Sequence, residues 1–171
     1  MHAETSILIR ADRDRIFDIV SDLDNWPKLL PHYRWIKTIH DSGEARIVNM
    51  AARRGWIPIQ WTSLYVVDRE ACEIRFTHLK AFTKGMHVVW KFARTPEGVH
   101  VRIVHDLELH WPLIGPFVAE RIIGQFFIEH VASRTLASFK KHLEMILVAQ
   151  ASLPVDSSHP TQAGTPVLPK K

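Results

Sequence analysis

One long amphipathic segment near the end of the chain constrains the fold more than any other feature. Between Pro116 and Val148, apolar residues recur mostly every three or four positions, while Lys, Arg, Glu and His fill much of the opposite side. This spacing is the period of an α-helix, and at about 1.5 Å per residue the helix is roughly 45–50 Å long. Such a stripe must be buried against another layer. Because most of the preceding chain has the pattern of β-strands, the sequence predicts one long helix lying across a curved sheet.

The segments before this helix alternate between apolar and polar residues, as in an antiparallel sheet with one solvated face. Strands are predicted at Thr5–Ile9, Tyr33–His40, Glu44–Arg54, Trp56–Asp68, Cys72–Leu79, Thr83–Arg94 and Val99–Leu109. After the first strand, Asp12 fits the N-cap of a helix, and a short helix is predicted between Trp26 and Leu30. The order strand, helix, strands and long helix predicts an α+β domain with its helices on one side of the sheet.

Composition fits one globular domain followed by a tail. The chain has 171 residues, of which 46% are hydrophobic and 23% charged, as in ordinary soluble proteins. We predict a domain over residues 1–149 and a disordered tail over 150–171, where Pro, Ser and Thr are frequent and no periodicity is visible. No apolar run approaches the ~20 residues of a membrane span, and no secretory signal is recognisable. We therefore expect a cytoplasmic protein without stable membrane insertion.

Charge and cysteine content exclude several classes of site. The net charge of +4 is scattered, and its densest groups are Arg53-Arg54 and Lys140-Lys141, so nucleic-acid binding is not expected. The sequence Arg53-Arg54-Gly55-Trp56 forms a basic hairpin tip that fits an anionic lipid, a carrier protein or no partner. The single cysteine, Cys72, rules out a disulfide framework. Because alternation turns His105 away from Asp106, Glu108 and His110, no metal site is predicted, and no cofactor is expected.

A family resemblance appears in the segment Asp24-Asn25-Trp26-Pro27-Lys28-Leu29-Leu30-Pro31-His32-Tyr33, in Trp61–Ser63, in Val88–Phe92 and in the final helix. Over residues 3–148 the chain resembles the START-like helix-grip superfamily. More narrowly, it is similar to the polyketide cyclase/dehydrase and lipid-transport family, which includes coenzyme-Q-binding proteins. The resemblance implies a helix-grip fold, with a curved antiparallel sheet of about seven strands around the long C-terminal helix. It also implies an elongated apolar cavity between them, which is a usual form of small-molecule site.

Three residues are candidates for catalysis. The resemblance implies that Tyr33 lines the cavity, where its phenol would donate a hydrogen bond or relay a proton. The alternative is a tyrosine on an edge strand with its hydroxyl in water. Tyr65 occupies the position where aromatase/cyclase relatives carry a cavity arginine that would stabilise an enolate. Because tyrosine carries no positive charge, this difference argues against the same cyclisation. His105 lies on an apolar strand face and is either an acid–base group or a neutral histidine buried in the core.

Further candidates would contact the ligand without reacting with it. These residues come from the Trp-Pro turn, the sheet and the long helix: Trp26, Trp61, Ser63, His78, Trp90, Ile122, Phe126 and Phe139. For Trp61 the alternative is ordinary packing on the inner face, and for Ser63 it is a hydroxyl bonded to the backbone. For His78 the alternative is a buried imidazole bonded to the backbone.

These observations leave three functions open. The first is a binding protein for a hydrophobic or aromatic small molecule of polyketide-, quinone- or lipid-like chemistry. The second is an aromatase/cyclase or dehydratase acting on a poly-β-keto intermediate, with an acyl carrier protein as a partner. The third is a protein-interaction role like that of the ribosome-association toxins. The missing arginine ranks the first above the second, and the scattered charge ranks the third last. The sequence leaves the oligomeric state open.

Overall fold

The computed structural model describes residues 2–81, 83–107 and 130–151. Its elements, in chain order, are β1 (His2–Ile9), α1 (Arg13–Ser21), the short 3-10 helix η1 (Leu23–Asn25), α2 (Trp26–Leu29), β2 (Tyr33–Asp41), β3 (Ala45–Arg54), β4 (Ile57–Asp68), β5 (Glu73–Lys80), β6 (His87–Thr95), β7 (Gly98–Asp106) and α4 (Ser133–Ala151). The strands form one sheet in the order β1-β7-β6-β5-β4-β3-β2, and all neighbours are antiparallel. The predicted α+β architecture with about seven strands is confirmed.

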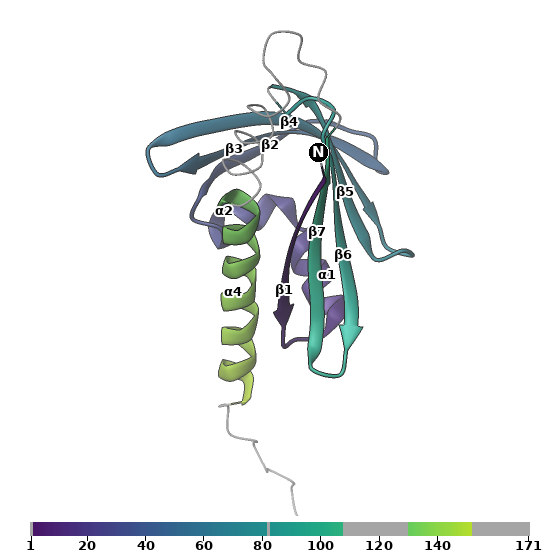
Figure 1. Cartoon of the computed structure of the whole chain (residues 1–171), viewed down its shortest axis with the longest axis vertical. Helices are drawn as coiled ribbons and strands as arrows, with labels where there is room; N and C mark the ends of the chain where they lie inside the picture. Colours follow the sequence, from purple (N-terminus) through teal and green to yellow (C-terminus); the bar gives the residue numbers. More distant parts are fainter. Residues whose placement is uncertain (1, 82, 108–129, 152–171) are drawn as a thin grey trace, which may run out of the picture.

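The sheet curves strongly, and the helices lie within its concave side. Figure 1 shows β2, β3 and β4 bending across the top of the molecule, while β1, β5, β6 and β7 run down one side. Helices α1 and α2 lie inside this curve, and α4 stands beside β1. The inner face therefore encloses the core, and α4 closes the open side of the curved sheet.

Alternation along the strands explains which face is buried. In β7 the side chains of Val99, Val101, Ile103 and His105 are buried, while the residues between them are more exposed. In β4, Ile59, Trp61, Ser63 and Tyr65 are buried, and Val67 on the same face is half-buried. Successive side chains of a strand point to opposite faces, so these residues share the inner face of the sheet. The apolar face predicted for His105 is confirmed in β7.

Side-chain hydrogen bonds fix the start of α1 and the position of α4. The Asp12 carboxylate accepts hydrogen bonds from the backbone N–H groups of Asp14 at 2.9 Å and Arg15 at 3.1 Å, as an N-cap does. Within α4, the Lys140 ammonium donates to Glu144 at 2.7 Å. It also donates to the Leu8 carbonyl at 2.7 Å, and this second bond ties α4 to β1.

Several predicted boundaries differ from the structure by one to four residues. The strand predicted from Thr83 begins only at His87, because a tight loop precedes it: Gly85 has φ +89° and its N–H donates to the His78 carbonyl at 2.9 Å. Helix α4 continues through Ala151, past the predicted start of the tail at residue 150. Residues 116–129 of the predicted long helix lie outside the described part of the chain, as do residues 152–171.

Candidate functional site

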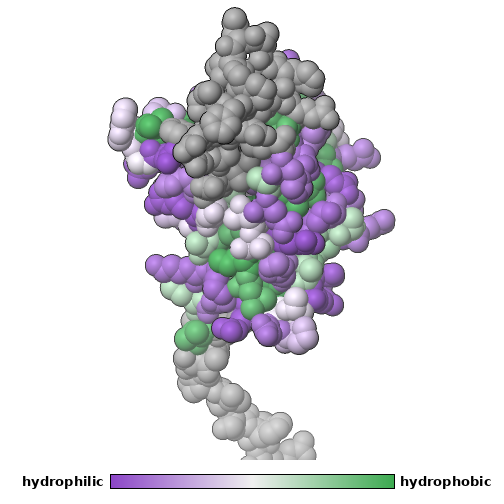
Figure 2. Space-filling view, in the orientation of Figure 1, coloured by the Kyte–Doolittle hydropathy of each residue, from purple (hydrophilic) through white to green (hydrophobic). Residues whose placement is uncertain are grey.

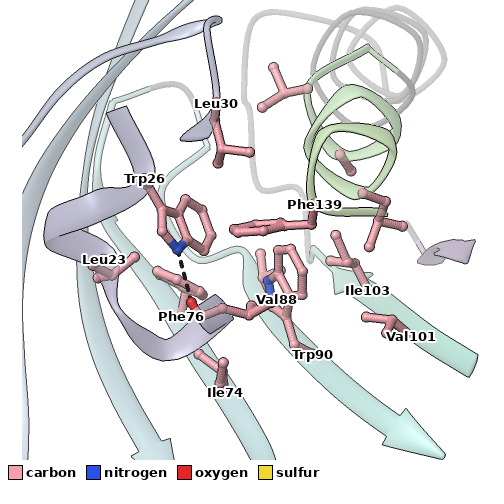
Figure 3. Packing of buried hydrophobic residues seen from close by; sticks show 14 of the residues in the cluster. Leu23, Trp26, Leu30, Ile74, Phe76, Val88, Trp90, Val101, Ile103 and Phe139 are labelled. Carbon is pink, nitrogen blue, oxygen red and sulfur yellow. Dashed lines mark hydrogen bonds between the residues drawn. The ribbon is translucent and has the colours of Figure 1, made fainter. Parts of the chain in front are cut away.

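Trp26, from the predicted Trp-Pro turn, is the centre of the aromatic core. Its indole N–H donates to the Val20 carbonyl at 2.9 Å, which satisfies the ring's polar atom. Its ring centroid lies 5.2 Å from that of Tyr33, 5.6 Å from Trp90 and 5.5 Å from Phe139. Figure 3 shows the side chains of Trp26, Trp90 and Phe139 converging from α2, β6 and α4. The turn therefore positions one large ring that joins three layers of the fold.

A cavity lies beside this ring cluster, between the inner sheet face and the start of α4. Its lining residues are Trp26, Tyr33, Met50, Trp61, Phe76, His78, Val88, Trp90, Ile103, His105, Val131, Ala132 and Thr135. The space available to the centre of a water-sized molecule is about 50 Å³, enough for a few waters. The walls are mostly aromatic and aliphatic, and only a few of the described lining residues have polar side chains.

His105 is the most informative polar group in the cavity. Its side chain is 4% exposed, and within the described structure its Nδ1 atom is buried without a hydrogen-bond partner. Burial lowers its pKa to about 4, although the neighbouring Asp106 opposes the shift. The imidazole is therefore neutral at pH 7. An unpaired buried nitrogen is costly unless a partner satisfies it, so this atom is suited to meet a ligand.

His78 lies near His105 but is held more firmly. Its Nδ1 atom is 2.7 Å from the Thr83 hydroxyl, and its ring stacks on Trp61 with centroids 6.1 Å apart. Burial, followed by the nearby His105 and His87, lowers its pKa to about 3. The tight β5–β6 loop supplies Thr83. The sequence prediction placed Thr83 in a strand and therefore missed the loop that orients His78.

A second polar group joins the turn before β2 to α4. The Thr135 hydroxyl donates to the Val131 carbonyl at 2.7 Å, and the His32 Nε2 atom lies 2.9 Å from the Thr135 hydroxyl oxygen. Because the hydroxyl has one proton and gives it to Val131, His32 Nε2 must be the donor, which defines its tautomer. Burial lowers the pKa of His32 to about 4, with Arg134 and His130 contributing further. This chain of bonds fixes Thr135 at the cavity wall.

Tyr33 faces the same cavity. Burial raises the pKa of its phenol, and the Thr135 hydroxyl partly opposes that increase. The phenol therefore stays protonated at neutral pH. Tyr33, Thr135, His78 and His105 thus supply hydroxyl and imidazole groups to one mainly apolar space.

Several predicted site residues lie elsewhere. The Tyr65 hydroxyl donates to the Ser21 carbonyl at 2.6 Å, the Arg46 guanidinium lies over its ring, and Tyr65 is not among the cavity-lining residues. Ser63 is fully buried and lies opposite His78 in the β4–β5 pairing. Its Oγ atom lacks a hydrogen-bond partner in the described structure, but Ser63 does not line the cavity.

The remaining predicted contacts divide between wall and core. Trp26, Trp61, His78 and Trp90 line the cavity together with Tyr33 and His105. Phe139 packs on Trp26 and Trp90 and belongs to the core behind the wall. Ile122 and Phe126 lie outside the described residues.

Sequence reasoning did not single out Thr135 and His32. Thr135 is a polar residue within the apolar stripe of the helix, between Ala132 and Leu136, and that interruption was the available signal. His32 stood within the recognised motif but carried no distinguishing pattern. Their contact joins residues 103 positions apart.

Among the residues that the structure describes, no three His, Cys, Asp or Glu side chains lie together as they would around a metal ion. No helix in this described part of the chain is long and apolar enough to cross a membrane.

Comparisons with known proteins agree with this architecture. A candidate polyketide cyclase of Streptomyces halstedii is 29% identical over 115 residues, which are 59% of this chain and 95% of that protein. The crystal structure of the Zhui aromatase/cyclase from Streptomyces sp. R1128 superposes with a TM-score of 0.78 at 14% identity, covering 90% of this chain and 99% of that one. A START superfamily protein from Mycobacterium smegmatis superposes with a TM-score of 0.65 at 14% identity, covering 85% and 98%.

The structural similarities establish the START-like helix-grip fold that the sequence predicted. The family assignment rests on a longer sequence match. The sequence model of the family described as polyketide cyclase / dehydrase and lipid transport matches residues 1–144. This chain therefore belongs to the polyketide cyclase/dehydrase and lipid-transport family.

Proposed function

We propose that this protein binds a hydrophobic or aromatic small molecule of polyketide-, quinone- or lipid-like chemistry in the cavity between the sheet and α4. The observation that carries the proposal is the unpaired Nδ1 atom of His105, buried in an otherwise aromatic cavity that also holds Tyr33. Apolar walls with a few convergent polar groups are typical of small-molecule sites. The family, and the cyclases among its relatives, support a ligand related to polyketides.

The protonation states favour binding over acid–base catalysis. Both cavity histidines have pKa values lowered by burial, to about 3 for His78 and about 4 for His105. An efficient general acid or base has a pKa near the working pH, and these imidazoles are weak bases that stay neutral at pH 7. A neutral imidazole and a protonated phenol can still form hydrogen bonds with a ligand carbonyl or hydroxyl.

The size of the cavity sets a condition on the proposal. Its volume of about 50 Å³ is well below the roughly 300–1,000 Å³ of pockets that enclose drug-sized ligands. Binding therefore requires wall side chains to move. A ligand that enters must separate the rings of the sheet from those of α4, so its binding should change the environment of the lining tryptophans.

Tryptophan fluorescence tests this directly. Trp26, Trp61 and Trp90 line the cavity, so titration with a flat aromatic polyketide should quench emission saturably. Ala132→Phe fills the space beside these rings and should abolish the quenching. Ala137→Phe is the matched control, because Ala137 is exposed on the same helix, and it should bind like the wild type.

If Ala132→Phe is unstable, Thr135→Val offers a milder change at the wall and should weaken binding severalfold. Equal quenching by the wild type and both wall variants would contradict the proposed site. Absence of saturable binding for polyketide, quinone and fatty-acid probes alike would contradict the function.

A second candidate is catalysis of cyclisation or dehydration on a poly-β-keto chain. The observation that favours it is that Tyr33 and His105 line the same cavity, so one carbonyl could meet both. A chain presented on an acyl carrier protein is the substrate for this test. Tyr33→Phe and His105→Leu should each reduce product formation at least tenfold while remaining folded. Unchanged turnover in both variants would remove this candidate.

A further inference from the structure

The turn between β3 and β4 projects one aromatic side chain into solvent. Trp56 is 90% exposed, which is unusual for tryptophan, because its large ring is mainly apolar. The preceding Gly55 has φ +59° and takes the first central position of a two-residue turn, where a type II′ hairpin favours glycine. The indole is therefore held at the tip of a defined hairpin.

Arginines lie on the strands that form this turn and on the elements beside it. Arg53 is the second-last residue of β3, and Arg34 lies on the neighbouring β2; both are exposed, and neither forms an ion pair within the described structure. Arg54 and Arg134 lie close to His130. The pKa of His130 is lowered first by burial and then by the positive charges of Arg134 and Arg54. The contributing stretches 30–35, 51–60 and 130–137 contain no Asp or Glu. We call Arg34, Arg53, Arg54, Trp56 and Arg134 the basic hairpin corner.

This corner adjoins the cavity. The Arg53 N–H donates to the His32 carbonyl at 2.9 Å, and His32 bonds to Thr135 of the cavity wall. Arg134 is the residue before Thr135 on α4. In Figure 1 the β3–β4 hairpin extends to the left above the start of α4, and Figure 2 shows that part of the molecule projecting at the upper left.

We propose that the basic hairpin corner docks the protein on the surface of a bilayer that contains anionic phospholipid, with Trp56 inserted at the headgroup level. Tryptophan prefers this interface because its ring is apolar and its N–H is polar. Clustered arginines add attraction to anionic headgroups. The proposal goes beyond the function of the cavity, because it concerns a surface that can bind membranes that contain no cavity ligand.

The shape of the corner favours a bilayer over a protein partner. A stable protein interface buries about 800 Å² on each side with complementary packing, which requires a broad face. A two-residue turn that projects one indole offers little area but suits insertion into a fluid surface. The position beside a cavity for apolar ligands adds a reason, because such ligands partition into membranes.

Vesicle flotation with the full chain tests the docking. The wild type should bind vesicles of phosphatidylcholine mixed with phosphatidylglycerol and should bind pure phosphatidylcholine much less. Trp56→Ala should weaken the binding about tenfold, given the apolar area that no longer inserts. Arg34→Gln and Arg53→Gln should each weaken it about fivefold and reduce its dependence on salt. All three side chains are exposed, so the variants should fold normally.

Matched controls come from other surfaces. Ile39→Ser removes an exposed apolar side chain from the far part of β2, and Lys141→Gln removes an exposed charge from α4; both should bind like the wild type. No binding by the wild type, or equal binding by the corner variants, would overturn the proposal. It would also be overturned if the corner variants bound vesicles normally but lost turnover of a carrier-bound substrate, since that result assigns the corner to a protein. Cavity binding measured by quenching remains a separate readout.

Discussion

The two tyrosines of the chain occupy opposite kinds of environment within one core. Tyr33 is 7% exposed and Tyr65 is 2% exposed. The Tyr65 hydroxyl is fully engaged by the Ser21 carbonyl at 2.6 Å, in a region closed by α1. Tyr33 instead faces the cavity beside Thr135. The comparison teaches that burial alone does not identify a functional residue: Tyr65 closes the fold, whereas Tyr33 remains available to a ligand.

The largest effect should come from Trp26, the ring at the centre of the aromatic core. Trp26→Ala removes a 1% exposed side chain that contacts Tyr33, Trp90 and Phe139. We expect a loss of about 3–5 kcal/mol in the free energy of unfolding, measured by urea denaturation. Trp56→Ala, at 90% exposure, is the control and should change stability by less than about 0.5 kcal/mol. Similar losses for both variants would contradict the central role of Trp26.

Acid should destabilise the cavity side next. Burial lowers the pKa of His105 from 6.5 to about 4, so between these values the unfolded chain binds more protons than the folded one. Keeping the His105 ring neutral therefore costs no stability above pH 6.5. The free energy of unfolding then decreases as the pH falls from 6.5 towards 4. Between pH 7 and 4, the wild type should lose about 2–3 kcal/mol more than His105→Leu. Parallel stability curves against pH would show that His105 is not desolvated as described.

Breaking the bond between His32 and Thr135 of α4 should have a somewhat smaller effect. Thr135→Val keeps the shape of the side chain but leaves the buried His32 Nε2–H without its acceptor at 2.9 Å. We expect a loss of about 1–3 kcal/mol. Thr135→Ser keeps the hydroxyl and should restore most of it. If serine and valine are equally destabilising, the methyl group rather than the hydrogen bond matters.

The smallest effects should separate the two tyrosines. Tyr65→Phe removes the bond to Ser21 and should cost about 0.5–1.5 kcal/mol of stability without changing ligand quenching. Tyr33→Phe should change stability less but weaken binding of a polar aromatic ligand roughly fivefold, as expected for one hydrogen bond. The reverse pattern, with binding lost only in Tyr65→Phe, would show that the ligand occupies the α1 side of the core.

Local patterns predicted much of this molecule. The alternation along β4 and β7 identified inward residues because the pleat has a period of two, and Asp12 was recognised as a cap because its carboxylate bonds within the next turn. The Trp-Pro segment pointed to the family. Trp61, His78 and His105 were predicted on apolar strand faces from the same alternation, and all three line the cavity.

Tertiary structure alone decided which inward residues meet the cavity. Tyr65 and Trp61 share one face of β4, yet only Trp61 lines the space, because the curved sheet brings Tyr65 against Ser21 and Trp61 against His78. The contact of His32 with Thr135 depends on the docking of α4 beside the turn between α2 and β2, which no local pattern encodes. Periodicity in the sequence determines the face on which a side chain lies. Its partners across that face are set by the curvature of the sheet and the position of the helix, which arise only when distant segments pack together.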